Sequence, residues 1–303
     1  MRRREFIALM GASVAWTFAA MAQELGRTYL LGSLEPNPRD WPVALAYFDE
    51  LRHRGFIEDQ NLKIDYRNFA PHVDLISEYA AELVKAKPDS IYAGGGVAVR
   101  AVQQATKTIP ILGVSDDMVG EGLVESLARP NSNTTGISIL ATELDGKRQD
   151  ILIEAVPGLR RMAALADSST LTQAKARALQ DAARARNVDL SIYPITKGGE
   201  EIAMAIDKAQ AWGAKALNVL ASPMLYANGG LIMERVAALR FPAMYQWPEM
   251  AEEGGFAAYG PRLNQLLVLA ARLVANLLRG IRPADLPIEQ PTQFELVPGI
   301  RVE

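Results

Sequence analysis

Short apolar runs alternate with longer amphipathic segments along nearly the whole chain. The runs at 28–34 and 89–93 have the length and composition of buried strands, and 62–66 alternates apolar with polar residues. The segments 42–54 and 73–84 instead place apolar residues three or four positions apart, as one face of a helix requires. Strands that alternate with helices predict a parallel sheet covered by helices, and hence an α/β fold.

The same pattern restarts after a turn-rich stretch at 128–133. A further strand at 255–259 precedes an amphipathic helix at 262–280. Between these points the patterning predicts strands near 135–140, 162–166, 188–193, 216–220 and 242–245, with helices near 143–155, 172–186, 200–212 and 225–239. We therefore expect two α/β lobes, each built on a doubly wound parallel sheet.

Residues 1–22 have the pattern of a secretory signal peptide: a basic start, an apolar middle and an Ala20-Met21-Ala22 exit site. The apolar middle is shorter than the roughly 20 residues that a helix needs to cross a bilayer, although an uncleaved anchor is the alternative. Arg3-Arg4-Glu5-Phe6-Ile7 looks like a twin-arginine signal, so both export routes stay open. No Cys follows, which excludes a lipoprotein anchor. The sequence predicts export to the periplasm.

Charge and cysteine content narrow the function. The 303 residues include 32 Lys plus Arg against 35 Asp plus Glu, for a net charge of -3, so nucleic acid is not an expected partner. With no cysteine, the chain has no disulfide, thiolate nucleophile or cysteine zinc site. The two histidines, His53 and His72, are expected to be solvated or capping residues. We predict no cofactor, no metal site and no catalytic residue.

Polar and aromatic residues follow the predicted strands. In open parallel sheets, ligands bind beyond the carboxyl ends of the strands, and two lobes of similar size can close on a small molecule about a hinge. We therefore expect a ligand-binding cleft. The residues expected to contact the ligand are Ser33, Glu35, Gly95, Gly96, Ser115, Asp116, Ser168, Ser222, Tyr245, Trp247 and Tyr259.

Gly94-Gly95-Gly96 follows a predicted strand and opens a predicted helix. Backbone N–H groups and the helix dipole at such a place can hold a carboxylate. A tight turn that needs glycine for backbone reasons alone is an equally open interpretation. The segment is not a dinucleotide fingerprint, because Val99 stands where the last glycine would be needed.

Gly113-Val114-Ser115-Asp116-Asp117 resembles a nucleophile elbow until its last position, which should be glycine. We therefore do not interpret it as one. Asp116 and Asp117 could serve as paired carboxylates in an exported α/β enzyme, which is the main alternative function. A polar cleft contact or a helix N-cap would explain the same two residues. Turnover that is lost in Asp116→Ala and Asp117→Ala would favour the enzyme.

Aromatic residues lie at the later strand ends, where Tyr245, Trp247 and Tyr259 could stack on a ligand. Packing within the hinge is the alternative for any single ring.

Several motifs in fixed order then point to a family. They are Arg2-Arg3-Arg4-Glu5-Phe6-Ile7, Ile109-Pro110-Ile111 with Asp117, Ser126-Leu127-Ala128-Arg129-Pro130 leading to Asn133-Thr134-Thr135-Gly136, Glu253-Gly254-Gly255 with Tyr259-Gly260-Pro261, and Arg282-Pro283-Ala284-Asp285-Leu286-Pro287-Ile288-Glu289-Gln290-Pro291-Thr292 with Phe294-Glu295-Leu296-Val297. Together they resemble the ABC transporter substrate-binding proteins of the tryptophan-binding-like family, from the signal peptide to about Val297.

This resemblance implies a type I periplasmic binding protein with three crossings between its lobes. Such a protein is a monomer that captures a small solute and delivers it to the membrane permease of an ABC importer, without catalysis. On the family pattern the crossings lie near 129–136, 246–255 and 287–294. The expected division is a signal peptide at 1–22, a first lobe at 23–130 plus 255–285, and a second lobe at 131–248 plus 288–303.

The expected ligand is an aromatic acid or an aromatic or hydrophobic amino acid. A carboxylate on the amides of Gly95 and Gly96 would suit either. An ammonium group on Glu35 or Asp116 would favour the amino acid. The resemblance also has a departure, because Gly95-Gly96-Val97 replaces the Thr-Pro pair usual in the family and so removes side-chain hydroxyls. A sensing domain of the same architecture is a further alternative, which would need a fused DNA-binding or signalling segment.

Overall fold

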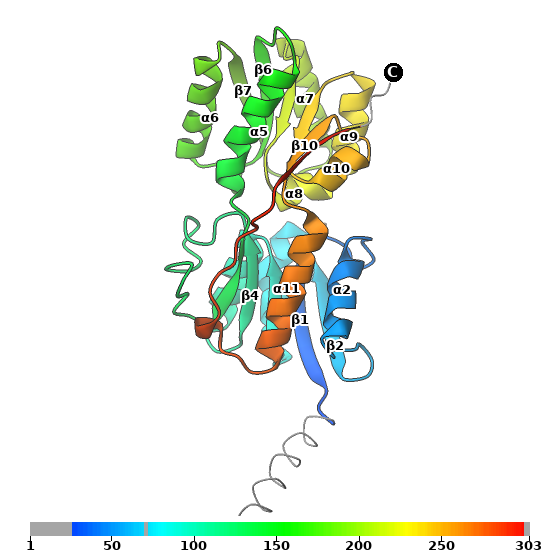
Figure 1. The fold of residues 1–303 in the computed structure, drawn as a ribbon, viewed down its shortest axis with the longest axis vertical. Coiled ribbons are helices and arrows are strands. Elements are labelled where there is room, and N and C mark those ends of the chain that lie inside the picture. Colours follow the sequence, from blue (N-terminus) through cyan, green and yellow to red (C-terminus); the bar gives the residue numbers. More distant parts are fainter. Residues whose placement is uncertain (1–25, 70–71, 300–303) are drawn as a thin grey trace, which may run out of the picture.

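The computed structural model describes residues 26–69 and 72–299 as two α/β lobes stacked along the long axis of the molecule (Figure 1). The predicted signal peptide at 1–22 lies outside the described residues. Within the described ranges, no helix combines the length and the apolar character that crossing a bilayer requires.

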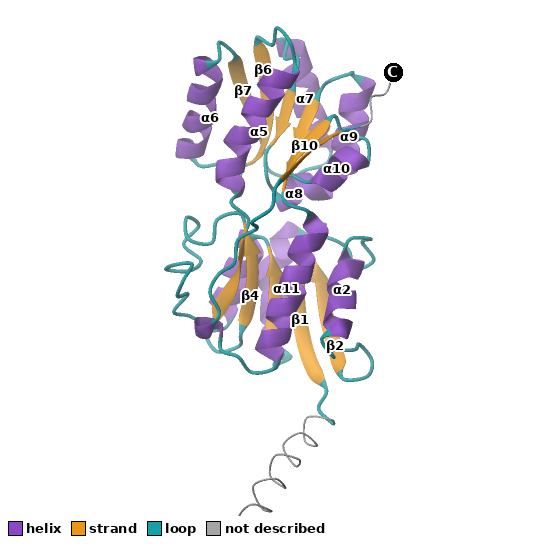
Figure 2. Cartoon of the chain, in the orientation of Figure 1, coloured by secondary structure: helices purple, strands orange, loops and turns teal. Residues whose placement is uncertain are grey.

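The first lobe is built on a five-stranded sheet of order β2-β1-β3-β4-β5, in which every neighbouring pair is parallel. Helices cover both faces, and the late helix α11 packs beside α2 (Figure 2). The strands are β1 (Tyr29–Glu35), β2 (Leu62–Asn68), β3 (Ser90–Gly94), β4 (Ile111–Ser115) and β5 (Thr134–Ser138); the helices are α2 (Ala44–His53), α3 (Ile76–Lys85), α4 (Gly96–Ala105) and α11 (Leu263–Leu278), with 3-10 turns at Val73–Leu75 and Pro283–Asp285.

The sheet of the second lobe has the order β7-β6-β8-β9-β10-β11. Its first five strands repeat the topology of the first lobe, and β11 is added at the edge. Its pairs are parallel except that the edge strand β11 runs antiparallel to β10. The strands are β6 (Arg161–Asp167), β7 (Asp189–Ile195), β8 (Leu217–Val219), β9 (Ala243–Tyr245), β10 (Ala257–Gly260) and β11 (Glu295–Pro298); the helices are α5 (Ala141–Ala155), α6 (Gln173–Ala185), α7 (Glu200–Trp212), α8 (Pro223–Ala227), α9 (Gly229–Ala238) and α10 (Pro248–Glu252).

The predicted fold class is confirmed, but two lobe boundaries were wrong. β5 pairs with β4 and completes the first sheet, although the expected second lobe began at 131. β10 pairs with β9 in the second sheet, so the chain returns to the first lobe only at α11, whereas the expected first lobe resumed at 255. A strand buried on both faces carries no periodicity that assigns it to one sheet or the other.

The chain crosses between the lobes at three places, as expected, but two of them are displaced. It crosses between β5 and α5, then between β10 and α11, and finally after Glu289, which still bridges to Ile137 of the first lobe. The expected crossings near 129–136 and 246–255 therefore lie several residues too early, while the one near 287–294 agrees with the structure.

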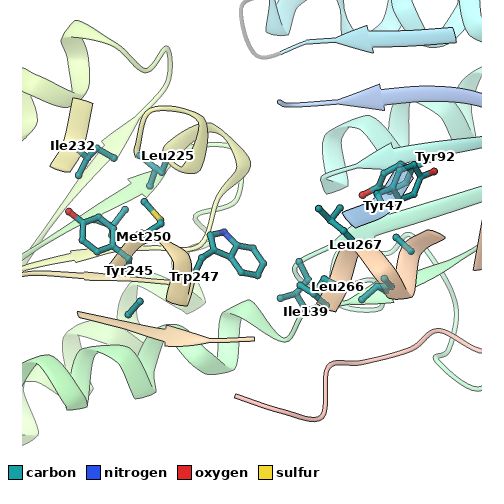
Figure 3. Packing of buried hydrophobic residues seen from close by; sticks show 14 of the residues in the cluster. Tyr47, Tyr92, Ile139, Leu225, Ile232, Tyr245, Trp247, Met250, Leu266 and Leu267 are labelled. Atoms are coloured by element: carbon teal, nitrogen blue, oxygen red, sulfur yellow. The ribbon is translucent and has the colours of Figure 1, made fainter. Parts of the chain in front are cut away.

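One hydrophobic cluster extends through both lobes. Trp247 of the second lobe lies at the gap between them, opposite Ile139, Leu266 and Leu267 (Figure 3). A second cluster that includes Val99 holds the other helix layer of the first lobe against its sheet. The core therefore does not stop at the lobe boundary, and its interlobe part borders the candidate site.

Candidate functional site

The carboxyl ends of the strands in both sheets face each other across a cleft. In the first lobe, Glu35 ends β1 and Gly94 ends β3. These two strands flank the point where the strand order reverses, the position at which doubly wound sheets bind ligands. The cleft contains two adjoining hollows, which we call the inner cavity and the outer chamber.

The inner cavity has a volume of about 100 Å³ and lies on the α11 side of the cleft. Leu263, Leu266 and Leu267 of α11 contribute its apolar wall, with Ile139 from the first crossing. Because α11 begins directly after the second crossing, this wall consists largely of residues at the hinge.

Three aromatic rings continue the wall from one lobe to the other. Trp41, which precedes α2, packs edge to face on Tyr226 of α8, with ring centroids 5.3 Å apart. Tyr226 in turn lies 6.3 Å from Trp247, also edge to face. All three rings line the inner cavity, so the lobes touch through aromatic side chains that a flat ligand could also contact.

Glu35 is a buried carboxyl on the inner cavity, 9% exposed. Ser33 Oγ lies 3.3 Å from its Oε1 and donates a hydrogen bond to it. Burial raises the pKa of Glu35 to about 8, and this hydrogen bond only partly offsets the effect. The side chain can therefore donate a hydrogen bond when protonated or bind a cation when ionised.

Asp116 follows β4 and borders both hollows. Burial raises its pKa to about 7, and the opposing influence of Lys175, from the second lobe, is smaller. Two carboxyl groups thus line the inner cavity, and none of the described residues lining it is Lys, Arg or His. Its electrostatics favour a ligand that brings a positive charge.

The glycine turn before α4 does not provide the expected pair of free amides. Gly95 N–H donates to the carbonyl of Val114 at 2.7 Å, so it is used within the first lobe. The carboxyl of Glu121 packs over Gly96. The expectation that both amides hold a ligand carboxylate is therefore wrong for Gly95. At this turn the first lobe lies close to the second, because a Cβ at Gly95 would lie 3.1 Å from Pro223 Cγ.

The outer chamber is much larger, about 830 Å³, and has a different lining. Hydroxyl groups from the second lobe dominate one wall, among them Ser168, Thr170 and Thr196. Lys175 and Lys197 line it as well. The inner cavity is consequently apolar and acidic, whereas the outer chamber is hydroxylated and carries both basic and acidic side chains.

Seven of the eleven predicted ligand contacts line one hollow or both. These are Glu35, Gly95, Gly96, Ser115, Asp116, Ser168 and Trp247. The structure therefore brings together residues that the strand-end argument placed at one edge, and their contact with ligand remains a proposal.

The other four residues line neither hollow. Ser33 is buried and hydrogen-bonded to Glu35, and Ser222 caps α8 while donating to Asp167 Oδ2 at 2.7 Å. Tyr245 is fully buried inside the second lobe, and Tyr259 packs on Phe294 with ring centroids 6.4 Å apart. Tyr245 points into the lobe, whereas Trp247, two residues later, lines the inner cavity. The chain changes direction between them, because β9 ends at Tyr245 and α10 begins at Pro248.

Sequence reasoning missed Trp41, Tyr92 and Tyr226. Tyr92 stacks on Tyr47 at 5.3 Å and lies within β3, where a core position was the natural interpretation. Trp41 directly precedes the Pro that opens the predicted helix, so its position at a loop end was the one available signal. Tyr226 belongs to the short α8, which the predicted helix at 225–239 had merged with α9.

The two residues of the candidate catalytic pair, Asp116 and Asp117, both line the outer chamber, but their carboxyls have different surroundings. Asp117 Oδ1 accepts hydrogen bonds from the amides of Val119 and Gly120, so this carboxyl stabilises its own turn. Neither His53 nor His72 lines the cleft hollows. Among the described residues, no group of three or more His, Cys, Asp or Glu is placed to hold a metal ion.

Two α/β lobes that enclose an aromatic-walled cleft at their strand ends define a solute-binding protein. The chain belongs to the family of ABC transporter substrate binding proteins, whose model matches residues 47–299. This confirms the resemblance drawn from the ordered motifs.

Individual relatives agree with this family. A tyrosine-binding protein of Clostridioides difficile is 24% identical over 257 residues, which cover 83% of this chain and 72% of the relative. A conserved domain protein from Vibrio cholerae has a similar structure, with a TM-score of 0.77, 23% identity and 89% and 91% of the two chains covered. An ABC domain from Streptococcus pneumonia, solved with L-Trp, has a TM-score of 0.72 and 20% identity, with 88% of this chain and 91% of that chain covered. At such low sequence identities, these solved structures show the fold alone.

Proposed function

We propose that this protein is the solute-binding component of an ABC importer and that it captures a small solute with an aromatic or hydrophobic body and an ammonium group, as aromatic amino acids have. The observation that carries the proposal is the inner cavity, in which the rings of Trp41, Tyr226 and Trp247 lie beside the carboxyls of Glu35 and Asp116. The rings match a flat apolar body, and the carboxyls match a cation.

The same lining argues against a simple aromatic acid. A carboxylate that entered the inner cavity would face Glu35 and Asp116 without a cationic side chain among the described residues that line it. The tyrosine-binding relative and the neighbour solved with L-Trp support an amino-acid-like cargo.

Delivery to a membrane permease and a location in the periplasm are part of this proposal. They rest on the family and on the predicted signal peptide at 1–22. A monomer suffices for this role, because both walls of the cleft come from one chain.

A thermal-shift screen tests the function. The chain without its predicted signal peptide is incubated with amino acids, aromatic amines, aromatic acids, sugars and purines. A ligand present at 100 times its Kd stabilises by about 2.7 kcal/mol, which is a shift of several degrees. We expect shifts with aromatic amino acids and amines and none with aromatic acids. A shift confined to sugars or purines, or no shift at all, would contradict the proposal.

Trp247→Ala identifies the site. It removes a ring from the inner cavity, so it should abolish the shift produced by the ligand. Trp212→Ala is the matched control, because Trp212 lies at the end of α7, away from both hollows. Equal loss of binding in both variants would mean that the inner cavity is not the site.

A further inference from the structure

The outer chamber has the size of a ligand site, whereas the inner cavity does not. Small-molecule sites typically have volumes of about 300–1,000 Å³. The outer chamber, at about 830 Å³, lies within this range, and the inner cavity, at about 100 Å³, lies below it. A ligand enclosed by the cleft therefore has most of its available space outside the ring of aromatic side chains.

The two hollows share a border. Pro36, Gly95, Asp116 and Pro223 line both of them. Asp116 is therefore placed to bind an ammonium group whose attached ring lies in the inner cavity and whose remaining substituent extends into the outer chamber.

The cationic groups of the outer chamber come from both lobes. Lys175, which is only 8% exposed, is held by Asp145 at 2.7 Å from Nζ to Oδ2. Lys197 lies on the same lobe, and Arg100 lines the chamber from α4 of the first lobe. An anion between them would be contacted from both sides, which stabilises a closed cleft.

Three of the four carboxyl groups that line the chamber are already engaged within the protein, and the fourth is Asp116. Asp167 accepts hydrogen bonds from Ser222 Oγ at 2.7 Å and from Ser169 N at 2.8 Å. Asp117 accepts from Gly120 N at 2.8 Å, and Glu121 from Asp117 N at 3.2 Å. The chamber's other polar groups are hydroxyls and the cations of Lys175, Lys197 and Arg100, which can bind carboxylates and peptide carbonyls. Two of these cations also have partners within the protein, because Lys175 pairs with Asp145 and Arg100 donates to the carbonyl of Glu121.

We propose that the outer chamber is a second subsite and that the cleft takes a dipeptide whose N-terminal residue is aromatic. This inference rests on the proposed function. The aromatic side chain and the N-terminal ammonium occupy the inner cavity and Asp116. The second residue lies in the outer chamber, with its C-terminal carboxylate among Lys175, Lys197 and Arg100.

Isothermal titration calorimetry with a matched ligand series tests the subsite. The series contains L-tryptophan, Trp-Gly, Trp-Glu and the reversed dipeptide Gly-Trp. We expect Trp-Gly to bind at least about tenfold more tightly than tryptophan, and Gly-Trp to bind more weakly than Trp-Gly. The reversed dipeptide would place its carboxylate beside Glu35 and Asp116.

A charge variant separates the subsite from the inner cavity. Lys197→Ala should weaken Trp-Gly by about tenfold and tryptophan by much less, because the carboxylate of tryptophan lies next to its ammonium group at Asp116, whereas that of Trp-Gly extends one residue further into the outer chamber. Lys215→Ala removes an exposed lysine that lines neither hollow, and it should change neither affinity.

The outcomes distinguish the two proposals. If tryptophan binds as tightly as Trp-Gly, or more tightly, the second subsite is wrong and capture of an amino acid stands. If no member of the series binds, the proposed function fails and the subsite inference fails with it.

Discussion

Arg148 Nη1 donates a hydrogen bond to the backbone carbonyl of Tyr259 at 3.1 Å. Arg148 lies in α5, shortly after the first crossing between the lobes, and Tyr259 lies in β10, just before the second. A single buried side chain therefore ties together the two crossings about which the lobes would move. Its guanidinium also pairs with Asp145, whose Oδ1 is 2.5 Å from Arg148 Nη2.

Asp145→Ala should strongly destabilise the protein. Its carboxyl is fully buried and pairs with both Arg148 and Lys175, so the substitution leaves two buried cations without their common anion. Breaking a buried ion pair from one side costs about 3–5 kcal/mol. Urea unfolding measures the change. Asp181→Ala is the control, because its pair with Arg184 is exposed and such pairs contribute about 0–1 kcal/mol. If both variants lose a similar amount of unfolding free energy, the buried ion pairs of Asp145 contribute no more to stability than the exposed pair, and the prediction is wrong.

Glu35 should make the stability of the ligand-free protein fall as the pH rises. Its pKa is about 8 in the folded protein and 4.5 when unperturbed, so the folded state holds a proton that the unfolded state has released. The contribution of the protonated form is fully present below pH 4.5 and is lost by pH 8. The steepest slope is about 1.4 kcal/mol per pH unit.

Glu35→Gln removes this titration and keeps the shape of the side chain. The difference in unfolding free energy between wild type and Glu35→Gln, measured by urea titration at several pH values, should decline across this window. If the difference in unfolding free energy stays constant with pH, the pKa of Glu35 is the same in the folded and unfolded protein, and the prediction is wrong.

Binding of an ammonium ligand should respond to pH in the opposite direction. Such a ligand pairs with ionised carboxyls, so binding releases protons from Asp116 and Glu35, whose pKa values are about 7 and about 8. The affinity for tryptamine should therefore rise from pH 6 to about pH 8. Calorimetry in buffers of different ionisation enthalpy counts the released protons. Glu35→Gln should reduce that count, and an unaltered count would assign the protons elsewhere.

Periodicity was sufficient for elements with one apolar stripe or one buried face. The predicted helix at 262–280 matches α11, because Leu266, Leu267, Ala270 and Val274 lie on one helical face and are all buried. β5 shows the limit: all five of its residues are buried, so the pattern predicted a strand but not which sheet contains it.

The sequence predicted those site residues that lie at strand ends. It did not predict the direction in which side chains point where a strand passes into a loop. Glu35 ends β1 and Asp116 follows β4, and the structure places both on the inner cavity. Tyr245 and Trp247 lie close in sequence, yet one packs into the lobe and the other faces the cleft. Contact of Trp41 with Tyr226 joins residues from different lobes, which no local pattern encodes.

Gly95→Ala should impair lobe closure more than it impairs folding. Gly95 has φ +94, where an L side chain is strained, and the added Cβ would approach Pro223 of the opposite lobe to 3.1 Å. Gly55→Ala is a matched control, since Gly55 has φ +87 and a Cβ there would meet nothing within 4 Å. Both substitutions should cost about 1–2 kcal/mol of stability through the backbone. Only Gly95→Ala should also weaken ligand binding and increase the radius of gyration measured by small-angle X-ray scattering with ligand present. If both variants bind ligand as the wild type does, the contact between Gly95 and Pro223 does not limit closure.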